Sequence, residues 1–356
     1  DHTIYFMIGL AGFLFLALTF LVPHFLQWFL QSEAILAESL VFLRYRRFGL
    51  LFGFFVLAFN AFYIGTTRTN ILIASTTLMA STNVFLDYIL IFGNFGMPLM
   101  GIAGAAMATN IAEVITFIFL VLWAWKDQSF SQFELFRFPK PNWMQYKPLL
   151  KIATPVMFQY FFSFSAWFVF FMVIEQIGET ALAASNITRS FYMLLMIPVW
   201  GLSSATNSLV SNLIGQGRSE EVIPLIKKVL IIGVGISLLV VQANIYFPEQ
   251  IASFFTEESH LVEATVPLLR VIAGALIAFA FGMIIFSGLS GTGKTFTALI
   301  IETVAIAFYL GTAFFLVIVM NATAPLVWFV EVIYFAMLGL LSIIYLRTDK
   351  WKVVDC

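Results

Sequence analysis

The chain has 356 residues, of which 61% are hydrophobic and only 10% charged, and its formal net charge is −1. Because a soluble domain carries roughly 25% charged residues, this composition excludes a soluble globular protein and a polybasic protein that binds nucleic acid. The single cysteine, Cys356, excludes a disulfide framework within the chain, and the three histidines lack metal-ligand spacing. We expect no cofactor.

The predicted elements are apolar helices long enough to cross a bilayer, which takes about 20 residues each. They are too long for the alternating segments of about 10 residues that form membrane barrels. Ten such segments occur in chain order, near 3–22, 36–62, 69–92, 99–125, 149–175, 181–213, 224–247, 262–288, 296–320 and 324–346.

These segments predict an all-α polytopic membrane protein of about ten helices. The only long polar connection follows the fourth segment. We therefore expect an N-terminal lobe at 1–125, a cytoplasmic linker at 126–147, and a C-terminal lobe at 148–356 that ends in a short cytoplasmic tail.

An internal repeat relates the two lobes. Gly65–Thr69 recurs as Gly291–Thr295, and the same spacing pairs Leu43-Arg44 with Leu269-Arg270. Repeats of this length, built from apolar segments, are typical of transporters. Residue 1 has its equivalent inside the second copy, so we expect two further helices upstream and six helices in each intact lobe.

The basic residues indicate an orientation. If the linker is cytoplasmic and the segments alternate, most of the 18 Lys and Arg residues lie on the cytoplasmic side, as the positive-inside rule requires. The sequence thus predicts a multi-pass protein of a bacterial or archaeal cytoplasmic membrane, with a cytoplasmic C-terminus.

Residues Gly288–Thr295 match the phosphate-loop pattern G-x-x-x-x-G-K-[ST]. A phosphate loop follows a strand, whereas this pattern follows the apolar segment 262–288, and its repeat partner near Gly65 lacks the pattern. We interpret it as a tight cytoplasmic turn and expect no nucleotide.

Several polar motifs resemble the multidrug and toxic compound extrusion (MATE) family. They are Asn83–Phe92, Gly101–Thr109, Ala181–Ile187, Pro198–Leu202 and Gly215–Arg218. The likeness runs from the family's third helix to its twelfth. In that family two six-helix lobes face a central cavity and export organic, often cationic, compounds in exchange for Na⁺ or H⁺. The resemblance implies a DinF-like antiporter, not an enzyme, that acts as a monomer in the lipid bilayer on small organic substrates.

The resemblance also implies a coupling site in the first lobe. Asn83 and Asp87 lie one helical turn apart and share a face, and Thr109 matches a Thr that helps form the family's cation or proton site. In the family an Asp on the first helix usually completes this site, and this chain does not contain that helix. A carboxylate in a low-dielectric setting can exchange a proton, or can bind Na⁺ together with amide and hydroxyl oxygens. Glu113 follows Thr109 by one turn and is a further candidate. The alternative is that these side chains only brace the lobe.

Candidates for a substrate cavity lie in the second lobe: Gln159, Ser163 and Trp167 on an aromatic helix, and the intramembrane acids Glu302 and Glu331. Some relatives carry a glutamate where Ser163 stands and an acid where Lys294 stands, so a second-lobe Na⁺ site of that type is not expected. The alternative is ordinary membrane packing for the aromatic helix, and hydrogen bonds that only brace the lobe for Glu302 and Glu331.

Two other functions fit a polytopic membrane protein. A lipid-linked oligosaccharide flippase of the same superfamily would need a cationic cavity, whereas the candidate cavity residues here are acidic. An integral membrane enzyme would need clustered catalytic groups, and the sequence has none of the common patterns.

Overall fold

The computed structural model describes residues 2–29, 32–128, 131, 133, 137 and 143–352. Within these ranges the chain is helical throughout and contains no strand. It divides into two compact units, unit 1 at 1–146 and unit 2 at 147–356. Half of the predicted linker at 126–147, and Cys356, lie outside the described residues.

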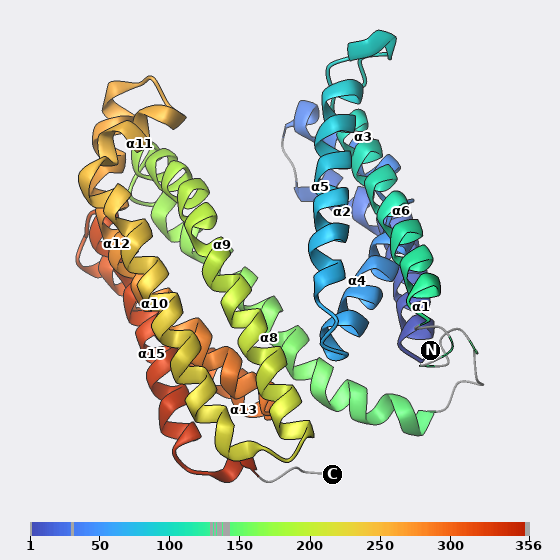
Figure 1. Cartoon of the computed structure of the whole chain (residues 1–356). Coiled ribbons are helices and arrows are strands. Elements are labelled where there is room, and N and C mark those ends of the chain that lie inside the picture. The colour runs from blue at the N-terminus through green and yellow to red at the C-terminus, as the bar shows by residue number, and fades with distance from the viewer. Residues whose placement is uncertain are drawn as a thin grey trace. The chain divides into compact units, whose positions relative to one another are not determined.

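Unit 1 is built mainly from α5 and α6, which pack along each other, and from α3 and α4, which both pack on α6 (Figure 1). Its elements are α1 (His2–Leu16), η1 (Ala17–Leu21), α2 (Val22–Phe29), α3 (Glu33–Arg46), α4 (Leu50–Gly65), α5 (Asn70–Leu90), η2 (Asn94–Gly96) and α6 (Ile102–Lys126).

Unit 2 is arranged around α12, which packs against α9, α10 and α15. Its elements are α8 (Trp143–Glu175), which begins just before the division, α9 (Glu179–Gly215), η3 (Ser219–Glu221), α10 (Val222–Tyr246), α11 (Pro248–Phe255), α12 (Ser259–Gly291), α13 (Thr295–Phe314), η4 (Phe315–Val319), α14 (Ala324–Trp328), α15 (Val330–Leu346) and η5 (Lys350–Lys352). In the most apolar stretch of α12, 67% of the residues are buried, so this helix forms the centre of the core.

Eight of the ten predicted spans coincide with helices that are long and apolar enough to cross a membrane. A ninth corresponds to the bent pair of α3 and α4. The tenth, α5, has 21 residues but is not among these helices, because its Ser, Thr, Asn and Asp side chains lower its hydropathy. The fold is therefore the expected all-α polytopic one.

The prediction of one continuous helix over 36–62 is wrong. The chain breaks after Arg46, and α4 starts at Leu50 in a direction that differs by 61°. Asn110 of α6 enters the break beside Gly49, where a Cβ atom would overlap the Asn110 side chain. The Asn110 Nδ2 atom donates a hydrogen bond of 2.7 Å to the carbonyl of Tyr45, which replaces a partner that a continuous helix would have supplied.

The repeated Gly-Thr turns have matching backbones. Thr67, between α4 and α5, has a φ of 60°, and the equivalent Gly293, between α12 and α13, has a φ of 83°. Both residues occupy the left-handed region that a tight turn requires and that glycine adopts at least cost. The element before Gly293 is helix α12 rather than a strand, as the sequence predicted for the phosphate-loop pattern.

Candidate functional site

Small residues allow α5 and α6 to approach closely. The face of α6 that packs on α5 begins with alanines and Gly104, which are buried. A Cβ atom on Gly104 would lie 2.6 Å from the carbonyl of Leu90, so only glycine permits this spacing. The close approach brings the polar residues in the middle of α5 within reach of those on α6.

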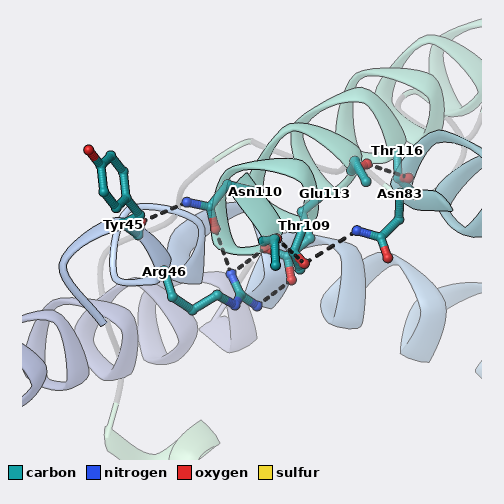
Figure 2. Close-up of polar contacts among 9 residues, drawn as sticks. Tyr45, Arg46, Asn83, Thr109, Asn110, Glu113 and Thr116 are labelled. Carbon is teal, nitrogen blue, oxygen red and sulfur yellow. Dashed lines mark hydrogen bonds and ion pairs between the residues drawn. The ribbon is translucent and has the colours of Figure 1, made fainter. Parts of the chain in front are cut away.

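The structure brings Asn83 and Thr109 together (Figure 2). The Asn83 Nδ2 atom donates a hydrogen bond of 3.3 Å to the Thr109 hydroxyl, which itself donates to the carbonyl of Ala105 at 3.0 Å. The amide oxygen of Asn83 points away from Thr109. Two of the predicted coupling residues therefore form one polar contact across the helix pair.

Asp87 lies one turn beyond Asn83 on α5 and is half-buried. Its Oδ1 atom is buried and has no hydrogen-bond partner among the described residues. A buried carboxylate oxygen without a donor is unfavourable unless it is protonated or contacts a cation. Amide and hydroxyl oxygens such as those of Asn83 and Thr109 are ligand types that hard cations prefer, and binding of a proton or Na⁺ at Asp87 stays a prediction.

Glu113 is held in an ion pair that the sequence analysis did not predict. Arg46 donates from Nη2 to Glu113 Oε1 at 2.6 Å and from Nη1 to Oε2 at 2.8 Å, with a further bond to Asn110 Oδ1 at 2.9 Å (Figure 2). The side chains of Arg46 and Glu113 are 23% and 12% exposed. Both carboxylate oxygens of Glu113 are thus engaged by the guanidinium, in a bidentate geometry.

This ion pair lines a cavity of about 240 Å³ between the end of α3 and helices α4, α5 and α6. Gly53 on α4 makes room for the carboxylate, since a Cβ atom there would lie 2.9 Å from Glu113 Oε1. Met79, one turn before Asn83, and Asn60 also line the cavity. Polar groups of α3, α4 and α6 therefore face this space in unit 1, whereas Asn83, Asp87 and Thr109 do not line it.

In unit 2 the predicted residues form two contacts. Ser163 donates its hydroxyl to Glu302 Oε1, and Trp167, one turn further along α8, contacts Glu331. Glu302 is 7% and Glu331 3% exposed. Gln159, one turn before Ser163, is buried as well, and its Nε2 atom has no partner among the residues described.

Two tyrosines that the sequence analysis did not single out complete this group. The Tyr309 hydroxyl donates to Glu331 Oε1 at 2.8 Å, and Tyr334 lies against Glu302. The rings of the two tyrosines contact each other in a tilted arrangement, with their centroids 5.4 Å apart and their planes at 55°. Helical spacing could have found them, because Tyr334 follows Glu331 by one turn and Tyr309 follows Glu302 by two turns.

A cavity of about 650 Å³ lies elsewhere in unit 2, beside the turn between α8 and α9 and the start of α14. None of the five predicted substrate residues lines it. In the parts of the chain that the structure describes, no group of three or more His, Cys, Asp or Glu side chains could hold a metal ion.

In the described parts of the chain, eight or nine helices can cross a membrane. Together with the sequence repeat and the buried acids Glu302 and Glu331, they define an integral membrane protein with the construction of a transporter. The family model described as MatE matches residues 1–89 and 155–317. The chain belongs to the MatE family.

Curated relatives agree with this membership. The chain is 29% identical over 255 residues to the "Probable multidrug resistance protein NorM" of Thermotoga maritima, covering 71% of this chain and 54% of the relative. It is 28% identical over 264 residues to the protein of the same name from Agrobacterium fabrum, covering 73% and 54%. The chain thus spans about half the length of the curated relatives it matches.

Solved structures share the fold. One, described as the outward-facing conformation of a multidrug resistance MATE family transporter of the MOP superfamily, has a TM-score of 0.85 at 21% identity, and the match covers 98% of this chain and 78% of the other. Another, a MOP superfamily transporter from Pyrococcus furiosus whose reverse polarity of the binding pocket is said to suggest a different function, has a TM-score of 0.86 at 21% identity and covers 99% and 80%.

Proposed function

We propose that the protein exports organic, cationic or amphiphilic drugs in exchange for H⁺ or Na⁺ by alternating access. Its MatE membership and its multidrug resistance relatives support this function. The observation that carries the proposal is the polar contact between Asn83 and Thr109 with Asp87 one turn away, because Asp87 Oδ1 is a buried acceptor that receives no hydrogen bond within the described part of the chain.

Ion exchange at Asp87 is the coupling step of this proposal. With a proton or Na⁺ bound, the carboxylate is neutralised and the closed packing of α5 on α6 is stable. When the ion leaves, the charge favours an arrangement in which solvent or a cationic substrate reaches the carboxylate. The ion and the drug thus stabilise different states, which is what an exchanger requires.

Glu113 has a different place in this scheme. Its carboxylate already has a positive partner in Arg46, so we assign the exchange step to Asp87. The role of Glu113 in coupling stays a prediction, since a change at Asp87 could reach the ion pair through Thr109, one turn before Glu113 on α6.

For substrate binding we retain Gln159, Ser163 and Trp167 on α8. Trp167 and the neighbouring aromatic rings suit flat cationic molecules by stacking and cation–π contact. Glu302 and Glu331 are closed inside unit 2, so their predicted contact with substrate requires an arrangement in which α8 moves. We further propose a monomer in the cytoplasmic membrane of a prokaryote, with a cytoplasmic C-terminus.

The test is ethidium efflux from proteoliposomes under an imposed H⁺ or Na⁺ gradient. We expect Asp87→Asn to abolish gradient-driven efflux, since an amide neither exchanges a proton nor supplies a charged ligand. Asp127→Asn is the matched control: it makes the same chemical change at the end of α6, where Asp127 pairs with Arg68 near the surface, and should leave efflux unchanged.

Efflux by Asp87→Asn at the wild-type rate would contradict the coupling assignment and leave Asp87 a bracing role. Folded wild-type protein that exports nothing under either gradient would contradict the drug-export proposal and favour the lipid-linked flippase instead.

A further inference from the structure

The interior of unit 2 contains two carboxyl groups that the proposed coupling step does not use. Glu302 comes from α13 and Glu331 from α15, and they are 7% and 3% exposed. Neither forms an ion pair with a Lys, Arg or His in the described parts of the chain. In contrast to Glu113, each is surrounded by neutral groups.

The groups that face the two carboxyls all come from neighbouring helices. Ser163 donates to Glu302 Oε1, and Tyr334 lies beside the same carboxyl. The Tyr309 hydroxyl donates a hydrogen bond of 2.8 Å to Glu331 Oε1, and Trp167 contacts the same carboxyl group. The remaining titratable group close to Glu331 is Tyr192 of α9, a neutral phenol. No positive charge is among these neighbours.

This environment has an energetic consequence. An ionised carboxylate away from water is unfavourable by several kcal/mol unless a positive charge or several donors compensate for it. Glu302 Oε2 is buried and lacks a hydrogen-bond partner among the described residues. Protonation removes the charge at little structural cost, whereas ionisation needs new donors or access to water.

A donor for the ionised form is close in sequence. Gln159 is one turn before Ser163 on α8, its side chain is 6% exposed, and its Nε2 atom is an unused donor within the described structure. Moving α8 by one turn along its axis, which is about 5.4 Å, would bring Gln159 to the position of Ser163. The unused acceptor of Glu302 and the unused donor of Gln159 within the described structure are the two groups that such an arrangement would pair.

We propose that Glu302 and Glu331 form a second proton-binding centre, inside unit 2, whose protonation is linked to the position of α8. In the packed arrangement both carboxyls carry a proton and are held by Ser163, Tyr334, Tyr309 and Trp167. When Glu302 releases its proton to water, the resulting carboxylate accepts hydrogen bonds from a different set of donors on α8. The centre contains two acids, so it can exchange up to two protons. As a part of the transport cycle it rests on the proposed function, but as a proton-binding centre it does not.

Infrared difference spectroscopy tests the proposal directly. Wild-type protein in lipid nanodiscs is titrated from acid to alkaline pH at constant Na⁺, and the C=O stretch of protonated carboxyl groups is followed. We expect Glu302→Gln and Glu331→Gln each to remove part of that band, and Asp87→Asn to leave that part in place. A band that is unchanged in both glutamine variants would overturn the proposal.

Ser163→Ala keeps both carboxyls and guards against variants that fail to fold. It removes the hydrogen bond to Glu302 Oε1, so the Glu302 component should keep its amplitude but move to higher wavenumber. No movement would overturn the assignment of that component to Glu302. The final measurement adds Na⁺ at constant pH. Loss of the C=O band would show that Na⁺ rather than a proton binds to the two carboxyl groups, and it would overturn the proposal.

These spectra require no transport. A protein that exports no drug can still show the second centre, and a working exporter can still lack it. The failure of this proposal and the failure of the proposed function are therefore separate results.

Discussion

The Arg46–Glu113 ion pair offers a quantitative test of how unit 1 is held together. We consider Glu113→Ala, which removes the carboxylate and leaves the guanidinium of Arg46 with Asn110 as its partner. Removing one member of a buried ion pair costs about 3–5 kcal/mol, because the other charge remains buried without compensation.

The exposure of the pair reduces this value. The side chains of Arg46 and Glu113 are 23% and 12% exposed, so part of the charge is already screened, and we expect a loss of about 2–4 kcal/mol. At about 2–4 °C for each kcal/mol, the thermal midpoint of the purified protein should fall by about 5–15 °C.

The matched control replaces both partners by apolar residues of similar size, Arg46→Met with Glu113→Leu. This double variant leaves no buried charge, so it should recover at least half of the midpoint lost in Glu113→Ala. Thermal unfolding in one detergent, followed by intrinsic fluorescence, measures all variants. A double variant that is as unstable as the sum of the two single changes would refute the reasoning, since the partners would then contribute independently.

Two glycine substitutions test the close helix contacts. Gly282→Ala should lower the free energy of unfolding by about 1–3 kcal/mol, because its Cβ would overlap the backbone carbonyl of Phe335, while Gly274→Ala on the same helix meets nothing within 4 Å and should be neutral or stabilising by up to about 1 kcal/mol. Equal effects of the two changes in thermal unfolding would contradict the packing. Gly104→Ala should separate α5 from α6 at Leu90 and lower ethidium efflux several-fold under either ion gradient, and wild-type efflux would show that this spacing is not needed.

The sequence predicted the helices well because the lengths and polarity of membrane helices follow directly from the bilayer. The contact of Asn83 with Thr109 also agrees with the predicted grouping, as helical spacing and the family motifs indicate the same face. Ser163 and Glu302 were both predicted for a substrate cavity, and in the structure they contact each other; their role in substrate binding stays a prediction.

The break between α3 and α4 was missed for a physical reason. Hydropathy averages over a window, so the apolar residues on both sides conceal the polar residues at the junction. The signal was nevertheless present: Arg46 and Arg47 stand next to Gly49 within an apolar stretch. Two adjacent arginines there require partners, and the partner of Arg46 was Glu113, the acid that the sequence analysis placed at the coupling site.

The side-chain contacts that α6 makes at the break between α3 and α4 also affect how unit 1 can move. A helix junction without side-chain support acts as a hinge, whereas here Asn110 contacts both the last turn of α3, through Tyr45, and the guanidinium of Arg46. Because Glu113 lies one turn after Asn110 on α6, side chains from two successive turns of α6 contact the junction between α3 and α4. Side-chain contacts therefore hold the bend, and in the proposed transport cycle a rotation of α6 would carry the end of α3 with it.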